Sequence, residues 1–425
     1  MKKSDYKIVS WHYRKTKEIP KNWDMVSLGR LCKVRKEGEV NSDLYVGLEN
    51  IGQGNNQLET VENVADFTST KNVFLKGDVL YGKLRPLLNK IWLAGKEGHC
   101  STDILPLIPN DKILGRMLLF VILNHDFYWY AVGMSAGTKM PRVNWSDMKN
   151  FLVALPPKAE QQKIALALSN VDSLIGETQK KIEQTQILKK GLMQKLLVKG
   201  INHTKFKKVK LGLRFIEIEI PQEWKIVKLG EYLFDVKGGA PLEPEDFTLD
   251  GFPVLHKGDI KSDDVIEIGK TNPFCSNDFA KDHQSSIIDN TYLVVTLRDL
   301  VPSGPTIGLI AHCTGEYLLA QGAYGFHHDK SKIDSRFLIH LSNSYFYRKY
   351  VRSMSVGSTQ IHIRTPEFLN LQLPIPPIDE QQKISVILSN LDYKIRKEQE
   401  FRTNFENLKK GLMQKLLTGQ IRVKV

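Results

Sequence analysis

The chain repeats one of its own segments, and this repeat constrains the fold more than any other feature of the sequence. Residues 155–201 return as residues 375–421 at a constant offset of 220, without a gap, and 24 of the 47 aligned pairs are identical. A second match opens each half, where IPKNWDMVSLG at 19–29 corresponds to IPQEWKIVKLG at 220–230, at an offset of 201. The chain is therefore one unit duplicated, with similar borders.

The interiors of the two halves, by contrast, barely resemble each other. Because the two offsets, 220 and 201, differ by 19, the second half carries 19 extra residues between its shared ends. Similar borders indicate a symmetric frame, and dissimilar interiors indicate two different ligands. Each interior contains short β-rich runs bounded by Gly, Pro, Asn and Asp, and a helical stretch at 116–130 or 335–352. We therefore predict a mixed α/β domain in each half.

The repeated segment predicts a long helix in each half. Both copies begin after Pro-Pro, which suits a first helical turn because proline lacks the N–H that this turn leaves unpaired. Apolar residues then recur at spacings of four, three and four, the pattern of a coiled-coil seam. About 35 helical residues at ~1.5 Å each give a rod on the order of 50 Å long. The seam residues are Ile164, Leu168, Val171 and Ile175 in the first copy and Ile384, Leu388, Leu391 and Ile395 in the second.

Two near-identical helices can bury such seams against each other about a two-fold axis. A single stripe would more often pack on its own domain, and it is the duplication that favours the pair. The pairing would be antiparallel and would hold the two domains at opposite ends. We expect a mixed α/β fold with a pseudo-two-fold internal repeat, in which two long helices form an antiparallel coiled coil. The expected divisions are residues 1–155 and 201–374 for the domains, and residues 156–200 and 375–425 for the helices.

Glycine occurs at informative places in both helices. Gly191 and Gly411 lie in the twice-occurring LKKGLMQKLL, where a glycine inside a helix costs roughly 1 kcal/mol relative to alanine. Two explanations stay open, a close backbone approach where helices cross and a docking surface for a partner subunit. Gly200 and Gly419 lie where C-terminal helix caps are expected.

The charge balance favours a polyanionic partner. Sixty Lys and Arg residues against 47 Asp and Glu give a net charge of +13, which points to nucleic acid first and to an anionic membrane second. Charge alone would equally suit a basic protein with a solvated surface. A basic stretch at 199–214 is either a solvated linker or a strap that contacts phosphates. The longest apolar run, at 117–123, is too short to span a membrane, and the four scattered cysteines predict reduced, buried thiols. We expect a soluble, cytoplasmic protein.

The sequence carries none of the catalytic patterns that we sought. It has no G-x-G-x-x-G loop after a strand, no G-x-S-x-G and no H-E-x-x-H. GMSAGTK at 133–139 is one residue short of a phosphate loop and lacks the hydroxyl residue after the lysine. The run His327-His328-Asp329 could ligate a metal, but such loops are more often solvated. We therefore predict a binding protein with no catalytic residue and no metal.

The layout of these motifs resembles the specificity subunits of type I restriction–modification systems. In each half I-P-x-x-W…L-G is followed by a variable region, by Gly-Thr or Gly-Ser-Thr-Gln, and then by P-P-x-x-E-Q-Q-K-I and a long helix. The resemblance covers nearly the whole chain. KMPR at 139–142 looks like a variant common in that family, whereas the second half has TQIH at 359–362. This departure indicates two domains of different subtypes, with different targets.

The resemblance implies a non-catalytic subunit that supplies the DNA address. Each variable domain would read one half of a split, asymmetric target in double-stranded DNA, and the helices would form the spacer and the platform for two modification subunits. Those subunits would bind S-adenosylmethionine and methylate adenine, and restriction subunits, with ATP and Mg, would join to cleave. This chain would need no cofactor. Half-sites one turn apart lie roughly 34–36 Å apart, which the rod can span.

The DNA contacts are predicted from residue type, because Arg, Lys, Asn and Gln read base edges and contact phosphates. We select polar and basic residues in Gly-, Pro- or Ser-rich stretches, although any one of them could instead cap a helix or lie idle on the surface. Rival interpretations are a duplicated coiled-coil scaffold, a nuclease with an unrecognised site, and an orphan specificity subunit without restriction partners. The selected residues are Lys83, Arg85, Lys139, Arg142 and Asn144 in the first half and Arg298, Ser358, Thr359, Gln360, His362 and Arg364 in the second.

Overall fold

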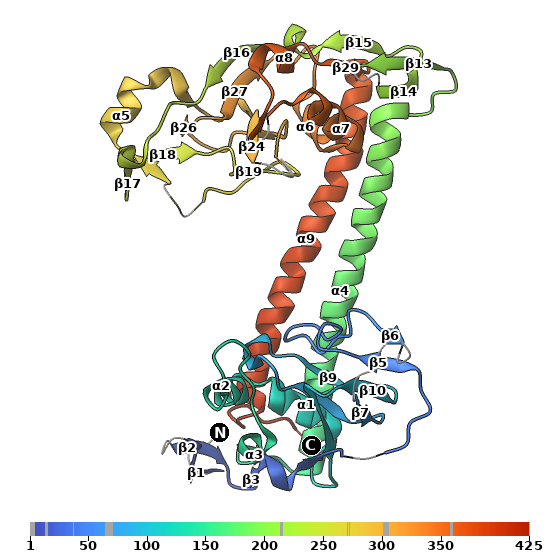
Figure 1. Ribbon diagram of the computed structural model, residues 1–425, viewed down its shortest axis with the longest axis vertical. Coiled ribbons are helices and arrows are strands. Elements are labelled where there is room, and N and C mark those ends of the chain that lie inside the picture. The colour runs from blue at the N-terminus through green and yellow to red at the C-terminus, as the bar shows by residue number, and fades with distance from the viewer. Residues whose placement is uncertain are drawn as a thin grey trace. The chain divides into compact units, whose positions relative to one another are not determined.

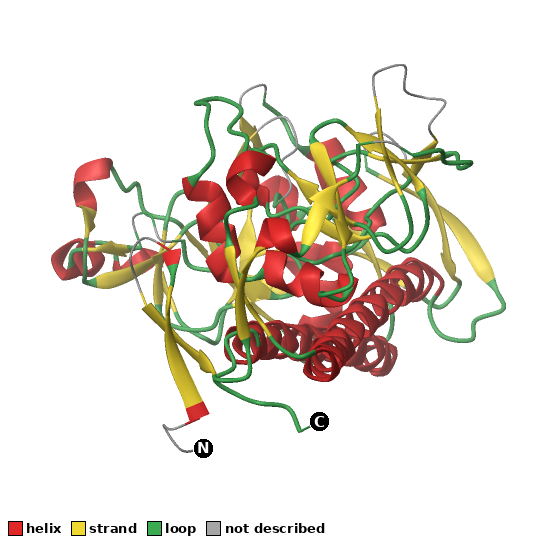
Figure 2. Ribbon diagram, turned by 90° about the horizontal axis from the view of Figure 1, so that it is seen from below, coloured by secondary structure: helices red, strands yellow, loops and turns green. Residues whose placement is uncertain are grey.

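The structure is a computed structural model that describes residues 5–12, 16–36, 38–63, 71–212, 216–269, 271, 273–300, 306–357 and 360–424. It divides into two compact units. The first combines residues up to Gln179 with residues from Glu400 onward, and the second comprises Lys180–Gln399. Each unit therefore contains one domain and parts of both long helices. Strands and short helices are interspersed in the domains (Figure 2), which confirms the mixed α/β class.

The repeated segment forms two long helices (Figure 1), α4 (Lys158–Lys199) and α9 (Ile378–Leu416). They have 42 and 39 residues, more than expected, and each is about 60 Å long. In the first unit Asp172 of α4 pairs with Lys409 of α9 at 2.6 Å, and in the second Lys189 of α4 pairs with Asp392 of α9 at 2.5 Å. An early residue of one helix meets a late residue of the other in both units, so the pair is antiparallel, as predicted. The two ion pairs are the same pair at the repeat offset of 220.

The first domain contains two four-stranded sheets, in the orders β6–β5–β10–β7 and β4–β11–β8–β9, and the pairs β1–β2 and β12–β3. Its strands are β1 (Tyr6–Ser10), β2 (Thr16–Pro20), β3 (Asp24–Ser27), β4 (Cys32–Val34), β5 (Leu44–Val46), β6 (Glu62–Asn63), β7 (Lys71–Phe74), β8 (Val79–Gly82), β9 (Ile91–Leu93), β10 (Gly98–Ser101), β11 (Ile104–Pro109) and β12 (Leu152–Leu155). Its helices are α1 (Gly115–Leu123), α2 (His125–Gly133) and α3 (Trp145–Met148).

The second domain contains the sheets β16–β27–β23–β25 and β17–β21–β18–β26–β22, and four two-stranded pairs. Its strands are β13 (Phe206–Leu211), β14 (Ile216–Pro221), β15 (Lys225–Lys228), β16 (Leu233–Gly238), β17 (Phe247–Thr248), β18 (Phe252–Leu255), β19 (Ile260–Lys261), β20 (Val265–Ile266), β21 (Phe274–Cys275), β22 (Ile287–Ile288), β23 (Leu293–Thr296), β24 (Arg298–Leu300), β25 (Ile310–His312), β26 (Tyr317–Leu319), β27 (Ala323–His328), β28 (Gln360–His362) and β29 (Gln372–Ile375). Its helices are α5 (Asn277–Asp282), α6 (Ser335–Asn343), α7 (Tyr345–Met354) and α8 (Thr365–Leu369).

The two domains share a topology although their interiors do not align. The order β4–β11–β8–β9 matches β16–β27–β23–β25, with antiparallel neighbours throughout. The order β6–β5–β10–β7 matches β21–β18–β26–β22, and in both sheets the central pair is the parallel one, β5 with β10 and β18 with β26. The second domain adds β17 at the edge of its sheet. Duplication therefore preserved the frame of each domain while its side chains changed.

Two local expectations from the sequence were incomplete. The stretches 116–130 and 335–352 each form two helices, because Asn124 and Ser344 are in extended conformation with ψ of 147°. Ser344 also caps α7 by accepting a hydrogen bond from the backbone N–H of Tyr347, which is how short polar side chains end one helix and begin the next. The basic stretch after α4 contains a strand that the sequence did not predict, since 206–211 is β13, paired with β14.

The two motifs that recur in the sequence contact each other. The indole Nε1 of Trp23 donates a hydrogen bond to Glu160 Oε2 at 2.9 Å, and Trp224 donates to Glu380 Oε2 at 3.0 Å. Both tryptophans are fully buried. The two glutamates lie in the first turns of α4 and α9, where a negative charge is favoured by the helix dipole. The same contact thus joins domain to helix in both units.

The next residue of each motif makes a second repeated connection. Gln161 donates to the carbonyl of Lys112 at 2.9 Å and accepts from the N–H of Leu114 at 3.0 Å. Gln381 makes the same two bonds, with the carbonyl of Lys332 and the N–H of Asp334. Both glutamine side chains are buried. Every partner is related by 220, so these contacts explain the glutamate and the first glutamine of the E-Q-Q motif.

The C-terminal end of α9 completes the core of the first domain, from which α4 starts. The C-terminal end of α4 completes the core of the second domain, from which α9 starts. Met413, Leu416 and Leu417 of the α9 end are buried in the first unit, and the end of α4 is buried likewise in the second. Gly200 and Gly419 adopt φ of +65° and +74°, which confirms them as helix caps. The predicted seam residues divide into buried ones, Ile164, Leu168, Val171, Ile384, Leu388 and Ile395, and half-buried ones, Ile175 and Leu391.

The glycines inside the helices do not mark a close crossing. A Cβ atom added at Gly191 or at Gly411 would meet nothing within 4 Å. Of the two explanations that the sequence left open, close backbone approach within this chain is therefore excluded. Both positions face open space.

Replacing Trp23 by Phe tests the contact between the two motifs. The variant keeps most of the buried ring but removes the N–H group that donates a hydrogen bond to Glu160. We therefore expect the free energy of unfolding to fall by about 1–3 kcal/mol. Trp129→Phe is the matched control, because its ring is 53% exposed, and it should stay within about 0.5 kcal/mol. Urea unfolding measures both, and equal losses would contradict the role of this bond.

Candidate nucleic-acid interface

Four of the residues selected in the first half are brought together by the backbone. Arg85 follows strand β8, and its N–H donates to the carbonyl of Pro141 at 2.7 Å. Leu84 and Arg142 form a β-bridge. A second bridge, between Ala136 and Arg142, closes a hairpin that has Lys139 at its tip. The N–H of Val143 donates to the carbonyl of Lys83, which adds this residue to the group. We name Lys83, Arg85, Lys139 and Arg142, with the nearby Asn144, the first contact cluster.

The members of this cluster differ in what their side chains can do. Arg142 makes a two-pronged pair with Asp103, at 3.0 and 3.2 Å, and this pair raises the pKa of the guanidinium. Arg142 is therefore committed to holding the hairpin. Arg85, Lys139 and Asn144 are exposed, and no ion pair is recorded for these three within the described part of the chain. They are the members free to contact a ligand.

The backbone of Arg85 is held in an unusual conformation. Its φ of +51° lies in the left-handed region, as does the φ of +46° at Asn89. A non-glycine residue in this region costs on the order of 1 kcal/mol and persists only where its surroundings fix it. The bonds from Arg85 to Pro141 and from Leu88 to Arg85 supply that constraint. Such strain is often found where a side chain must be presented in one direction.

The second half forms the equivalent group. Arg298 on β24 pairs with His362 on β28, and the same strand carries Gln360. Arg364 follows at the N-cap of α8, exposed and held by an ion pair with Glu367 at 3.6 Å. We name Arg298, Gln360, His362 and Arg364 the second contact cluster. Ser358 and Thr359, which the sequence also selected, lie outside the described residues.

Backbone hydrogen bonds show that the two clusters occupy the same place in their domains. The N–H of Val143 donates to the carbonyl of Lys83, and that of Ile363 donates to the carbonyl of Leu297. The two donors, Val143 and Ile363, are equivalent at a sequence offset of 220. The two acceptors, Lys83 and Leu297, are equivalent at an offset of 214. The bridge between Ala136 and Arg142 likewise returns between Val356 and His362. Two groups chosen from dissimilar sequences are thus equivalent in structure.

A second element of each domain was missed by the sequence analysis. In the first domain a hairpin follows β5, where Asn50 Oδ1 accepts from the N–H of Gly47 and Ile51 pairs with Leu58. In the second a hairpin follows β18, where Asp259 Oδ2 accepts from the N–H of His256 at 2.8 Å. Asn50 and Asp259 are equivalent at a sequence offset of 209. The 19 extra residues of the second half are therefore inserted at several places along its domain. The sequence signal that could have revealed these two equivalent hairpins is an Asn or Asp followed by Ile just after a strand.

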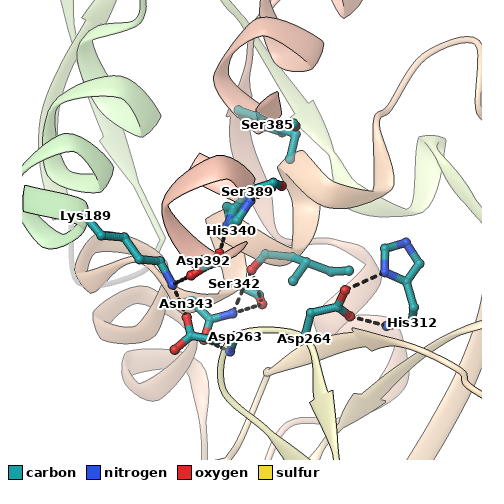
Figure 3. A network of polar contacts seen from close by, with 12 residues as sticks. Lys189, Asp263, Asp264, His312, His340, Ser342, Asn343, Ser385, Ser389 and Asp392 are labelled. Atoms are coloured by element: carbon teal, nitrogen blue, oxygen red, sulfur yellow. Dashed lines mark hydrogen bonds and ion pairs between the residues drawn. The ribbon is translucent and has the colours of Figure 1, made fainter. Parts of the chain in front are cut away.

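In the second unit this hairpin is tied to the helices by a polar network that is buried on the helix side (Figure 3). Lys189, whose side chain is 8% exposed, pairs with Asp392 and also with Asp263 at the hairpin tip. The N–H of Asp263 donates to Asn343 Oδ1 at 3.0 Å, at the end of α6. In the first unit Lys409 keeps the pair with Asp172. Only in the second unit, therefore, does the hairpin contribute a carboxylate, that of Asp263, to the lysine–aspartate ion pair that both units share.

His340 lies at the centre of this network. Its Nε2 is 3.1 Å from Ser389 Oγ, and its Nδ1 is 3.8 Å from Asp392 Oδ2 (Figure 3). Burial, assisted by the charge of the nearby Lys189 and opposed by that of Asp263, lowers the pKa of His340 to about 4. Burial also raises the pKa of Asp392. The histidine is therefore neutral at physiological pH.

The described residues show no site for a metal and no span across a membrane. Within the described ranges, no three His, Cys, Asp or Glu side chains come together as a metal site would require. His327 instead contacts Asp235 at 3.3 Å and Thr291 at 2.9 Å. None of the described helices is long and apolar enough to cross a membrane. The four cysteines are free and buried, as predicted.

A family model described as the type I restriction modification DNA specificity domain matches residues 20–185 and 221–404. These ranges cover most of the chain and include most of both domains and of both long helices. The chain therefore belongs to the family of type I restriction–modification specificity subunits. In these systems the specificity subunit determines the DNA target, is not catalytic and carries no cofactor of its own.

Individual relatives support the same assignment. The chain is similar to the specificity subunit of the type I restriction enzyme MjaVIII from Methanocaldococcus jannaschii, with 28% identity over 417 residues, 96% of this chain and 94% of the relative. It is also similar to the putative type I restriction enzyme MjaX specificity subunit from the same organism, with 25% identity over 446 residues, 97% of each chain. Both similarities span the two domains and the two helices.

Solved structures show that the fold is shared. The S subunit of a type I system from M. genitalium matches with a TM-score of 0.56 and 16% identity, over 93% of this chain and 96% of that one. A chain from a study of complex assembly and conformational transition of the type I restriction–modification system matches with a TM-score of 0.58 and 17% identity, over 95% and 99%. At these identities the likeness concerns the fold alone.

The buried His340 predicts a dependence of stability on pH. An unfolded histidine binds its proton near pH 6.5, whereas the folded one binds it near pH 4. Between these values the unfolded chain carries the extra proton, so the free energy of unfolding falls as the pH falls, by up to about 1.4 kcal/mol per pH unit. Above pH 6.5 the stabilising contribution of the neutral, buried His340 to the free energy of unfolding is fully present.

Urea unfolding at several pH values from about 7.5 to 4 measures this dependence. His340→Gln should lose less stability on acidification than the wild type does. His125→Gln is the control, since His125 is exposed, and it should follow the wild-type profile. Identical profiles for His340→Gln and the wild type would refute the assignment.

Proposed function

We propose that this chain is the specificity subunit of a type I restriction–modification enzyme that recognises a bipartite, asymmetric sequence in double-stranded DNA. The observation that carries the proposal is the pair of contact clusters, which are equivalent in backbone position and different in side chains. A duplicated frame suits a duplex whose two strands are related by symmetry. Different side chains suit two half-sites of different sequence.

The recognition domains in this proposal are residues 1–155 and 201–374, and residues 156–200 and 375–425 supply the helices between them. Arg85, Lys139 and Asn144, together with the half-buried Lys83, would contact the first half-site. Arg298, Ser358, Thr359, Gln360, His362 and Arg364 would contact the second. Arg142 would act through the hairpin that it holds by its pair with Asp103. The net charge of +13 supports such a contact with a polyanion.

The partners in this proposal are two modification subunits, one for each copy of the repeated helix segment. Leu188 and Leu408 are 52% and 48% exposed although they are apolar. Gly191 and Gly411 follow on the same face with open space beside them. A surface that exposes leucine beside a glycine gap, in identical form twice, suits two copies of one partner. We name Leu188, Gly191 and Lys195, with Leu408, Gly411 and Lys415, the outer faces.

The proposed complex acts in the cytoplasm, where its DNA is. The modification subunits would bind S-adenosylmethionine and methylate adenine on each strand. Restriction subunits, with ATP and Mg, would join for cleavage. This chain would direct both activities to one sequence.

Co-expression with the modification subunits, followed by genome-wide mapping of methylated adenines, tests the proposed function. We expect one motif in two parts, asymmetric, with a fixed unread gap. DNA binding by the complex should weaken steeply with salt, because contacts with phosphates release counterions. Absence of methylation, together with DNA binding that is weak and insensitive to salt, would instead favour a protein scaffold.

Arg85→Ala tests the first contact cluster. If Arg85 contacts a base, the variant should lose about 1–3 kcal/mol of binding free energy and relax one position of the first half-site, with the second unchanged. Lys96→Ala is the control, because Lys96 is an exposed cation of the same domain outside the cluster. Methylation mapping and titration of labelled duplex give the two readouts. A uniform loss over all sequences would assign Arg85 to a phosphate instead.

The outer faces predict opposite effects of small and large substitutions. Gly191→Ala with Gly411→Ala should raise the free energy of unfolding by up to about 1 kcal/mol at each site, since alanine favours the helix and its Cβ meets nothing. Gly191→Trp with Gly411→Trp should leave the chain folded but reduce its co-purification with the modification subunits. Retained assembly of the tryptophan variant would show that the partners bind elsewhere.

A further inference from the structure

Each unit contains a cavity between its domain and the pair of long helices. The cavity of the first unit has a volume of about 890 Å³ and that of the second about 720 Å³. On one side each is lined by α4 and α9. On the other side it is lined by the tip of the hairpin that the sequence analysis missed, and by the turn between two short helices, α1–α2 or α6–α7.

The helical walls of the two cavities are nearly identical. Seven helix positions line both cavities at an offset of 220, and six of them carry the same residue. The exception is Gln186, which corresponds to Glu406. The identical pairs are Lys189 and Lys409, Lys190 and Lys410, Met193 and Met413, Gln194 and Gln414, Asp392 and Asp172, and Ile395 and Ile175.

The domain walls of the two cavities differ completely. Four positions in the turn between the short helices line both cavities, and none carries the same residue in both, as with His125 and Tyr345 or Tyr128 and Arg348. The hairpin tips differ as much. The first presents Gln53, Asn55 and Gln57, and the second presents Lys261, Ser262 and Asp263. Each cavity therefore has one common wall and one individual wall.

The common wall offers one uncompensated cation in each unit. Lys189 and Lys409 are neutralised by Asp392 and Asp172 and are almost buried. Lys190 and Lys410 are exposed, as are Gln194 and Gln414 one turn further along. For neither Lys190 nor Lys410 does the described structure record an ion pair. An ammonium and an amide one turn apart are suitable donors for the oxygens of a phosphodiester.

A two-part DNA target accounts for both walls. The phosphate backbone is the same in both half-sites, so contacts to it can use the same residues in both units. The bases differ between half-sites, so the residues that face them must differ. A protein partner present in two copies would not explain the cavities, because half of each lining is individual. Such a partner has the outer faces, which are identical in both units.

We propose that each cavity receives one strand of the DNA backbone, held by Lys190 and Gln194 in the second unit and by Lys410 and Gln414 in the first, with the hairpin tip beside it reading base edges. In the first unit the exposed amides of Gln53 and Gln57 match the two hydrogen-bonding groups of adenine in the major groove. This inference rests on the proposed function. It adds the helices and the hairpins to the contact clusters as parts of the DNA interface.

The common wall is tested in the assembled complex with Lys190→Gln combined with Lys410→Gln. The control is Lys163→Gln combined with Lys383→Gln, which removes the same charge from exposed positions of the same repeat that lie outside both the cavities and the outer faces. We expect the first double variant to weaken binding of the mapped target and of unrelated DNA alike. The slope of log K against log salt should fall by about 2, one for each lysine. The methylated motif should stay the same.

Three results would overturn this assignment. One is that the double variant and its control bind DNA alike, and another is that the double variant changes the motif. The third is a loss of modification subunits from the complex, which would assign these lysines to assembly. If the wild-type complex binds DNA and yields a bipartite motif, the proposed function stands whatever these variants do. If it does neither, both proposals fail.

The hairpin is tested separately with Gln53→Ala combined with Gln57→Ala. We expect relaxed specificity at one or two positions of the first half-site, an unchanged second half-site and an unchanged salt slope. The thermal unfolding midpoint should equal that of the wild type, because both side chains are exposed. An unaltered motif, or a change in the second half-site, would refute the role of this hairpin.

Discussion

The buried hydrogen bond between an indole and the first turn of a long helix is the contact on which the architecture depends. It joins Trp23 to Glu160 and Trp224 to Glu380, and the neighbouring Gln161 and Gln381 connect the same helix starts to a second loop. These bonds fix where each helix leaves its domain. Because they are the same in both units, the duplicated frame is specified twice by the same chemistry, and the rest of each domain is free to differ.

The molecule separates what is common to its two halves from what is individual. The common part consists of the helices, their cross-helix ion pairs and the domain topology. The individual part consists of the contact clusters and the hairpin tips. This division also explains why the hairpin tip of the second unit can donate Asp263 to the ion pair of Lys189 while the first unit lacks an acid there. Side chains on the individual wall can change without disturbing the frame.

The sequence predicted the frame well because periodicity and repetition express it directly. The mixed α/β domains and the caps at Gly200 and Gly419 follow from local patterns, and the antiparallel pairing of the helices follows from the duplication. The breaks at Asn124 and Ser344 were missed, since a short polar residue ends one helix and begins the next only where tertiary packing favours the extended backbone. The two hairpins were missed because their equivalence lies in backbone hydrogen bonds, while the offset shifts from 201 to 209, 214 and 220. That Arg142 is held by Asp103, 39 residues away, depends on tertiary structure alone.

The first unit is assembled from two stretches of chain with the entire second unit between them. Its core includes Met413, Leu416 and Leu417, and Glu160 at its centre pairs with Arg422. As the chain leaves the ribosome, the second unit is complete once Gln399 has emerged, whereas the first still lacks part of its interior. The N-terminal domain is therefore synthesised first and finished last, and a truncated product leaves its apolar interior open to solvent.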